Sequence, residues 1–293
     1  MSITENVPAS RGHRVRANGI DIHYLDHGNG HPLVLLHGGV VSTNPIWTGV
    51  PVAYAGHMDM LAEHFRVIAP DTRGCGRTVH SGGAISFDLL ADDVAALIDA
   101  LDLERPLIAG FSEGGITATV LANRHPDAVR AIVNHAGFDA FDADGPTIAM
   151  MRQILGGSPD ATKPDPDAAA RGFEASEQMR AMFELMKRDQ DGGQGEGHWR
   201  EYLRLSWDRC TQDPGYTLVD LAQIAAPTLI LAGDRDDFCT VEAAVAAYRQ
   251  LQHGELAILP NTGHLITPAA IETTIEFFAR QLASPAGSAP AAG

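Results

Sequence analysis

The sequence predicts an α/β fold with a mostly parallel central sheet flanked by helices. Short apolar runs rich in Val, Ile and Leu alternate along the chain with segments of helical periodicity, a pattern typical of βαβ units. The 293 residues include 45% hydrophobic and 20% charged residues, which is enough apolar material for a sizeable core. No internal repeat interrupts this alternation.

Seven segments are expected to supply the strands. The first, HRVRANGIDIHYLDHG, is expected to form two strands around Asn18-Gly19, because this dipeptide is a strong hairpin signal. The other six are short apolar runs of the buried parallel type, PLVLLHGG, FRVIAPD, PLIAGFS, VRAIVNHAG, PTLILAGD and GELAILP, at residues 32–39, 65–71, 106–112, 129–137, 227–234 and 254–260.

Helices are expected between these runs. In residues 86–101 the apolar side chains share one helical face, and Ser86 stands where an N-cap residue belongs. Residues 241–251 and 267–282 show the same periodicity and are expected to be helices as well.

One connection, from Gly137 to Pro227, is far too long for a simple loop. It contains helical stretches at residues 147–155, 171–188 and 198–210, with loop-like breaks between them. We interpret it as a small helical cap inserted before the last two strands. The expected organisation is a core domain of residues 1–137 and 223–282, a helical cap of residues 138–222 and a disordered tail of residues 283–293, which contains small residues and proline without charge.

Charge and cysteine content exclude several classes of protein. The net charge of −16 argues against nucleic acid and anionic membrane surfaces as partners, because both repel an acidic protein. Three cysteines are too few for a disulfide framework in a chain of this length. No window has the length and apolarity of a transmembrane helix, and the N-terminus lacks the apolar core of a secretory signal, so a cytoplasmic location is expected. The sequence indicates no particular oligomeric state.

The stretch LIAGFSEGGITATV places Ser112 between an apolar run and a helical pattern, with glycines at positions 110 and 114. In G-x-S-x-G after a strand, the glycines permit a sharp, strained turn that lifts the serine hydroxyl clear of the sheet. The pentapeptide alone is also compatible with a plain strand-to-helix turn in which Ser112 is only a cap, because Gly and Ser are common residues.

The surrounding pattern favours a nucleophile. Serine needs a base that is held by a third group. LAGDRDDF and LPNTGHL place acids and then His264 after the last two strands, in the chain order Ser, Asp, His. PLVLLHGG ends in glycines whose backbone N–H groups suit an oxyanion. These parts all follow parallel strands, so they are expected at one edge of the sheet.

With these motifs the chain resembles the α/β-hydrolase fold superfamily, in its compact type with a helical lid. The carriers are HGG at residues 37–39, DTRGCGRT at 71–78, GFSEGG at 110–115, GDRDDF at 233–238 and NTGHL at 261–265. The resemblance implies Ser112 as nucleophile, His264 as base and backbone N–H groups of Gly39 and Glu113 as oxyanion donors. The family's G-x-x-D spacing places the acid on Asp236. Asp234, Asp237 and the remoter Asp139 stay open as alternatives.

The expected activity is hydrolysis of a small carboxylic ester or lactone through an acyl-enzyme intermediate, without a cofactor. The histidines show no metal-binding spacing, and the Gly-rich stretches match no nucleotide-binding fingerprint. The same triad suits an amidase, a perhydrolase, an acyltransferase or a carbon–carbon bond hydrolase. A non-catalytic ligand-binding protein of the same fold is the alternative from another class.

Overall fold

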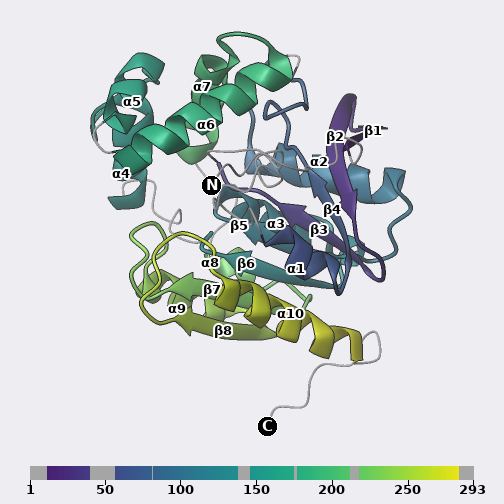
Figure 1. Cartoon of the computed structure of the whole chain (residues 1–293). Coiled ribbons are helices and arrows are strands. Elements are labelled where there is room, and N and C mark those ends of the chain that lie inside the picture. The colour runs from purple at the N-terminus through teal and green to yellow at the C-terminus, as the bar shows by residue number, and fades with distance from the viewer. Residues whose placement is uncertain are drawn as a thin grey trace, which may run out of the picture.

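The computed structural model describes residues 12–39, 57–80, 82–137, 146–174, 177–211 and 218–283. In these residues an eight-stranded sheet runs through the molecule in the order β1-β2-β4-β3-β5-β6-β7-β8 (Figure 1). The strands from β3 to β8 are parallel to one another, whereas β2 is antiparallel to β1 and β4. Their bounds are β1 Gly12–Ala17, β2 Ile20–His27, β3 Pro32–Leu36, β4 Arg66–Pro70, β5 Leu107–Phe111, β6 Ala131–His135, β7 Thr228–Gly233 and β8 Gly254–Leu259. The expected α/β fold with a mostly parallel sheet is confirmed.

The first two strands form the hairpin that Asn18-Gly19 predicts. Both turn residues have positive φ, 44° at Asn18 and 76° at Gly19, which is the requirement of a two-residue turn with the twist of the strands. The central strands β3, β5, β6 and β7 are buried almost throughout, in keeping with their continuous apolar composition.

Helices cover both faces of the sheet. Contacts link α1 with α10, and a second series joins α2 to α3, α3 to α8 and α8 to α9. The bounds are α1 Met58–Ala62, α2 Phe87–Ala100, α3 Glu113–Arg124, α8 Leu218–Leu221, α9 Val241–Gln250 and α10 Pro268–Ala283. Ser86 caps α2 as expected, since its hydroxyl accepts a hydrogen bond from the Leu89 N–H. No helix in the described ranges has the length and apolarity needed to cross a membrane.

Four helices between β6 and α8 lie together at the C-terminal ends of the strands, at the top of Figure 1. They are α4 Pro146–Gly156, α5 Pro166–Phe173, α6 Glu177–Gln194 and α7 His198–Cys210. Their buried apolar side chains form a cluster of their own, which Cys75 from the loop after β4 joins. A helical insert stands where the sequence predicts one. Its independence as a domain stays a prediction. The expected tail of residues 283–293 begins one residue too early, because Ala283 belongs to α10, and residues 284–293 lie outside the described residues.

Two helix boundaries in this insert differ from the expected ones. Of the helix expected over residues 171–188, residues 171–173 belong to α5 and residues 177–188 to α6. Helix α5 begins inside the expected loop, where Asp165 caps it and Pro166 occupies its first turn. Helix α6 continues through the expected break as far as Gln194. A Cβ on Gly193 would lie 1.9 Å from the Gly76 carbonyl oxygen, so glycine inside α6 permits close approach to the loop after β4.

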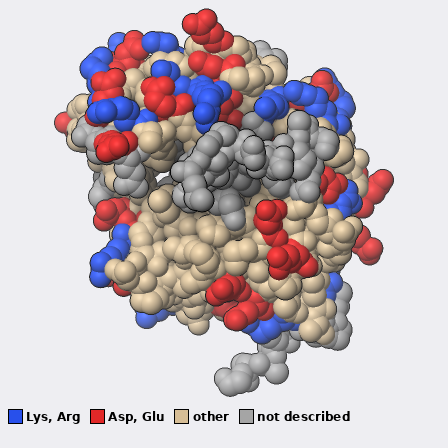
Figure 2. Space-filling model, in the orientation of Figure 1, with Lys and Arg blue, Asp and Glu red and all other residues tan. Residues whose placement is uncertain are grey.

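Acidic and basic side chains are interspersed over the insert on the face shown in Figure 2. Several of them form exposed ion pairs, including Arg200 with Asp167, Arg204 with Glu201 and Lys187 with Glu184. Exposed pairs of this kind contribute about 0–1 kcal/mol each to stability. The buried apolar cluster, and not these pairs, therefore holds the four helices together.

Candidate active site

Ser112 stands on a sharp turn between β5 and α3. Its backbone has φ 52° and ψ −119°, a conformation that non-glycine residues rarely adopt and that marks a strained, functional turn. The turn is held by hydrogen bonds from the Ser112 N–H to the His135 carbonyl (2.8 Å) and from the Ile116 N–H to the Ser112 carbonyl (3.1 Å). The side chain is half-buried, not covered by the helix that follows.

The two glycines of the G-x-S-x-G motif are required by backbone contacts. A Cβ on Gly110 would lie 2.1 Å from the Gly114 carbonyl oxygen, and one on Gly114 would lie 2.5 Å from the Leu36 carbonyl oxygen. Strand β5, helix α3 and the end of β3 therefore approach more closely here than side chains allow. The motif thus builds an elbow, and Ser112 makes no side-chain cap bond to α3.

His264 connects Ser112 with an acid. Its Nε2 lies 3.1 Å from the Ser112 Oγ, and its Nδ1 lies 3.0 Å from both carboxylate oxygens of Asp236. Ser112 follows β5, Asp236 follows β7 and His264 follows β8, so the ends of three parallel strands bring these side chains together at one edge of the sheet. This is the arrangement of a nucleophile, a general base and a group that orients the base.

The three aspartates after β7 differ in their surroundings. Asp236 is buried and accepts hydrogen bonds from the Phe238 and Cys239 N–H groups, at 2.8 and 3.0 Å, which fixes its carboxylate under the His264 ring. Asp237 is exposed. Among these three, Asp236 is the one whose carboxylate contacts His264, whereas the remaining alternative, Asp139, lies outside the described residues.

Asp234 supports the loop that carries His264, a role that the sequence did not indicate. Its Oδ1 accepts a hydrogen bond from the Thr262 N–H (3.0 Å), two residues before His264. Backbone N–H groups of Asn261 and Thr262 lower the pKa of this exposed carboxyl group, because they stabilise its charged form. Asp234 therefore ties the loop that carries His264 to the end of β7.

The segment after β3 lies against the elbow. A Cβ on Gly38 would be 2.8 Å from the Phe111 ring and 3.4 Å from the Ser112 Cβ, so glycine permits this approach. Gly39 is the last described residue of the segment and lies beside the Glu113 side chain. The structure thus brings Gly39 and Glu113 together next to Ser112. Their role as oxyanion donors stays a prediction.

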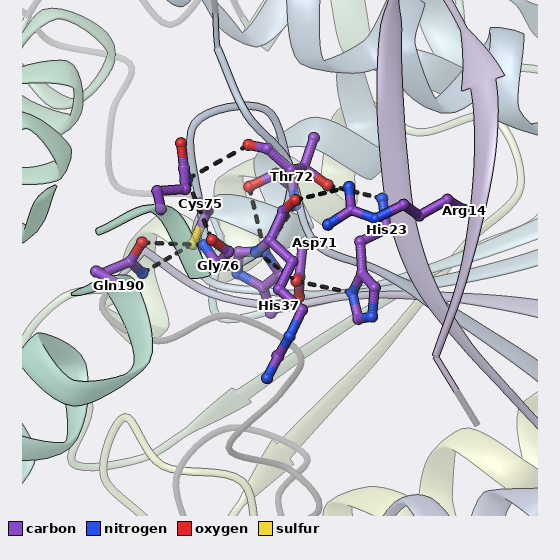
Figure 3. A network of polar contacts seen from close by, with 11 residues as sticks. Arg14, His23, His37, Asp71, Thr72, Cys75, Gly76 and Gln190 are labelled. Carbon is purple, nitrogen blue, oxygen red and sulfur yellow. Dashed lines mark hydrogen bonds and ion pairs between the residues drawn. The ribbon is translucent and has the colours of Figure 1, made fainter. Parts of the chain in front are cut away.

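His37 and the loop after β4 brace this segment from below (Figure 3). The His37 Nδ1 donates to the Gly38 carbonyl (2.7 Å), and its Nε2 accepts a hydrogen bond from the Thr72 N–H (3.1 Å). These two bonds together require the neutral ring with its proton on Nδ1. His37 is thereby occupied in holding Gly38, which agrees with a structural role.

Polar contacts hold the loop after β4 on two sides. Asp71 accepts a hydrogen bond from the Arg77 N–H (2.9 Å) and lies 3.0 Å from the His23 Nδ1. On the other side Gln190 of α6 accepts from the Gly76 N–H (2.9 Å) and donates to the Cys75 sulfur (3.1 Å) (Figure 3). The loop therefore connects the segment beneath the elbow with the helical insert.

The cysteines are poorly suited to act as nucleophiles. Burial raises the pKa of Cys75 well above its ordinary value, and the nearby carboxylates of Asp189 and Asp71 raise it further. Burial and the carboxylate of Glu113 do the same to the pKa of Cys210. Cys239 is fully buried. Since the thiolate is the reactive form, the first two stay protonated and unreactive near neutral pH.

His135 lies buried behind the elbow at the end of β6. Its ring packs edge-on against Phe111 at a centroid distance of 5.5 Å, and its Nε2 has no hydrogen-bond partner among the described residues. Burial, followed by the nearby His264, lowers the pKa of His135 to about 3. The ring is therefore neutral in the folded protein and packs as an apolar group.

This neutral histidine makes stability depend on pH. The unfolded chain binds a proton at His135 below about pH 6.5 and the folded protein only near pH 3, so stability falls as the pH drops between these values. The slope from this residue is about 1.4 kcal/mol per pH unit. We expect His135→Leu to lose less stability than the wild type between pH 6.5 and 4.5, measured by urea unfolding. Equal losses in both proteins would show that His135 does not titrate in this way.

Comparisons with known proteins identify the family to which the fold belongs. Residues 31–267 match the family model described as the alpha/beta hydrolase fold. The AB hydrolase superfamily protein YisY of Bacillus subtilis is 30% identical over 250 residues, which cover 82% of this chain and 87% of that protein. A 2-hydroxy-6-oxo-2,4-heptadienoate hydrolase of Pseudomonas putida is 27% identical over 281 residues, 89% of this chain and 92% of that one.

A solved structure, the enol-lactonase of Burkholderia xenovorans, superimposes with a TM-score of 0.68 at 19% identity and covers 92% of this chain and 100% of its own. At that identity the likeness concerns the fold. The family match extends over most of the chain and includes the elbow at Ser112, the ends of β7 and β8 and the segment after β3. The chain therefore belongs to the alpha/beta hydrolase fold family.

Proposed function

We propose that this protein is a serine hydrolase that cleaves a small carboxylic ester or lactone with Ser112, His264 and Asp236. The observation that carries the proposal is the position of His264, whose two ring nitrogens lie 3.1 Å from the Ser112 Oγ and 3.0 Å from the Asp236 carboxylate. A plain strand-to-helix turn needs neither partner.

In the first half of the reaction the Ser112 oxygen attacks the substrate carbonyl carbon while His264 Nε2 takes the hydroxyl proton. The carbonyl oxygen becomes an oxyanion, which we expect the backbone N–H groups of Gly39 and Glu113 to stabilise. One such donor contributes about 3–4 kcal/mol in comparable sites. When the tetrahedral intermediate collapses, the carbon–oxygen bond of the ester breaks and His264 returns the proton to the leaving alkoxide. An acyl group remains on Ser112.

In the second half a water molecule takes the place of the alcohol. His264 accepts a proton from the water as its oxygen attacks the acyl carbon, and the proton then passes to the Ser112 oxygen as the acid is released. Throughout, Asp236 holds the Nδ1 proton and stabilises the imidazolium that forms twice. A lactone undergoes the same steps, with the alcohol and the acid released as one molecule.

Carbon–carbon bond hydrolysis is the second candidate, since the Pseudomonas putida relative is named a 2-hydroxy-6-oxo-2,4-heptadienoate hydrolase. That substrate is a carboxylate, and its recognition calls for a cation in the site. Among the described residues, Arg209 is a buried cation beside the elbow, and it already pairs with Glu113. A neutral ester or lactone needs no such partner, which is why we place it first.

A fluorophosphonate probe and a substrate panel test the proposal. The probe reacts with an activated serine, so we expect it to label wild-type protein at Ser112, as peptide mass analysis would show. The panel contains p-nitrophenyl esters of increasing chain length, lactones, amides and a vinylogous 1,5-diketone. We expect turnover of short esters or lactones. Labelling with turnover of the diketone alone would favour the second candidate, whereas no labelling and no turnover would indicate a non-catalytic binder.

A further inference from the structure

An ion pair from the helical insert reaches the residue directly after Ser112. The Glu113 Oε2 accepts a hydrogen bond from the Arg209 Nε (2.6 Å), and its Oε1 accepts one from the Cys210 thiol (3.0 Å). Both donors stand at the end of α7, whereas Glu113 is the first residue of α3. The Arg209 side chain is only 4% exposed and that of Glu113 only 16%. The pair is therefore a largely buried ion pair between the helical insert and the elbow.

The carboxylate of this pair lies against Gly39, one of the two expected oxyanion donors. A Cβ on Gly39 would be 1.9 Å from the Glu113 Oε1, so the carboxylate covers this glycine directly. The backbone N–H groups of Gly39 and of Glu113 itself are the two expected oxyanion donors. An ionised Glu113 without a partner would thus place a negative charge next to the site where the reaction creates another. Like charges at this separation raise the energy of the intermediate.

Arg209 is held so that it faces Glu113. Its Nη2 donates to the Ser206 Oγ (3.0 Å), and its guanidinium carbon lies 5.5 Å from the centre of the Tyr202 ring. Burial is the strongest influence and disfavours the charge on this guanidinium, but the surrounding groups, the Glu113 carboxylate first among them, together raise the pKa of Arg209 above its ordinary value. Arg209 is therefore charged at every pH at which the protein is folded.

We propose that Arg209 is a positioning residue for hydrolysis, which neutralises the Glu113 carboxylate beside the oxyanion site. The inference rests on the proposed function, and it adds a requirement on Arg209, which no motif contains. We call this the charge model. In the alternative, structural model the ion pair only holds α7 against the elbow, and its charge has no effect on the reaction. Replacing one partner at a time distinguishes the two models. The charge model predicts a larger loss of kcat when Arg209 is replaced than when Glu113 is replaced, whereas the structural model predicts equal losses.

The charge model predicts that Arg209→Met loses roughly ten- to a hundredfold in kcat at pH 8, with KM changed far less. Glu113→Gln, whose amide oxygen still accepts from Arg209, costs far less than Arg209→Met. The double variant Glu113→Gln/Arg209→Met recovers most of the loss, because the stranded carboxylate is gone. Arg204→Met is the matched control, since Arg204 lies on the same helix and pairs with the exposed Glu201. It keeps wild-type kcat.

The pH profile of kcat supplies a second readout. In Arg209→Met alone we expect a falling limb at higher pH, as the stranded Glu113 ionises. The other groups around Glu113 do not produce this limb. Cys210 and Tyr202 stay protonated because burial raises the pKa of each, and His37 is neutral and bonded to Gly38. Asp236 and His264 are common to every variant.

The outcomes separate the alternatives. The charge model is overturned in favour of the structural model if Arg209→Met and Glu113→Gln lose equal amounts of kcat and the double variant does not recover. A pH profile of Arg209→Met without a falling limb overturns it as well. Should Arg209→Met fail to fold, the double variant and Arg209→Lys carry the test, and loss of more than nine tenths of kcat in both overturns it. Fluorophosphonate labelling of the wild type is run alongside. Its absence would show that the proposed function has failed, and not this inference alone.

Discussion

Replacement of Ser112 by Ala is expected to reduce ester hydrolysis to the background rate, a loss of roughly 10⁶-fold in kcat. The hydroxyl oxygen is the atom that forms the acyl-enzyme, and His264 alone places no nucleophile at the carbonyl. Stability should change by less than about 0.5 kcal/mol. The elbow is shaped by close backbone contacts at Gly110 and Gly114 and by the hydrogen bond from the Ser112 N–H to His135, which alanine retains.

Ser86→Ala provides the matched control. Its hydroxyl accepts a hydrogen bond from the Leu89 N–H at the start of α2, so the variant should lose about 1 kcal/mol of stability and keep wild-type turnover. Ser112→Ala is thus expected to lose activity and keep its stability, whereas Ser86→Ala loses stability and keeps its activity. Urea unfolding and p-nitrophenyl ester turnover measure the two quantities. Wild-type turnover by purified Ser112→Ala would show that another group is the nucleophile.

The sheet could be predicted because its signals are local. Asn18-Gly19 needs only two residues with positive φ to make a hairpin, and a continuous apolar run reports that a strand is buried on both faces. The elbow belongs to the same class, since Gly110 and Gly114 act through backbone contacts within a few residues and with the adjacent strand. Parallel strands then bring Ser112 and His264 to one edge although 152 positions separate them.

The insert could be predicted less well because its boundaries depend on tertiary contacts. Gly192 and Gly193 would end an isolated helix, yet α6 continues because Gly193 packs on the backbone of Gly76. The pair of Glu113 and Arg209 joins residues 96 positions apart, and no spacing rule connects an elbow acid with an arginine at the end of a cap helix.

The aspartate cluster shows where spacing stops being sufficient. Asp234, Asp236 and Asp237 are the same residue type within four positions, and the sequence favoured one of them only through a family pattern. Burial and hydrogen bonds separate them in the structure. Asp236 receives two backbone N–H bonds and faces His264, and Asp234 supports the histidine loop.

Asp236→Asn is expected to lower kcat by about 10⁴-fold with little change in fold. An asparagine side chain can keep an oxygen toward the Phe238 and Cys239 N–H groups, and its amide then faces His264. The amide donates a hydrogen bond where the carboxylate accepted one, so the ring turns to the tautomer that carries its proton on Nε2. That nitrogen can no longer accept the Ser112 proton, and the imidazolium loses its neighbouring charge.

Asp234→Asn and Asp237→Asn are the matched controls, because each removes one carboxylate from the same loop. In Asp234→Asn the new amide oxygen still accepts from the Thr262 N–H, so the histidine loop stays in place and the loss should be within a fewfold. Asp237 is exposed, and its field at His264 is screened by water and salt. The three variants are compared on one ester, with circular dichroism to confirm folding. If Asp234→Asn or Asp237→Asn were the inactive variant, that residue would be the acid in place of Asp236. If all three variants kept wild-type turnover, the acid would lie elsewhere, and Asp139 would be the next residue to replace.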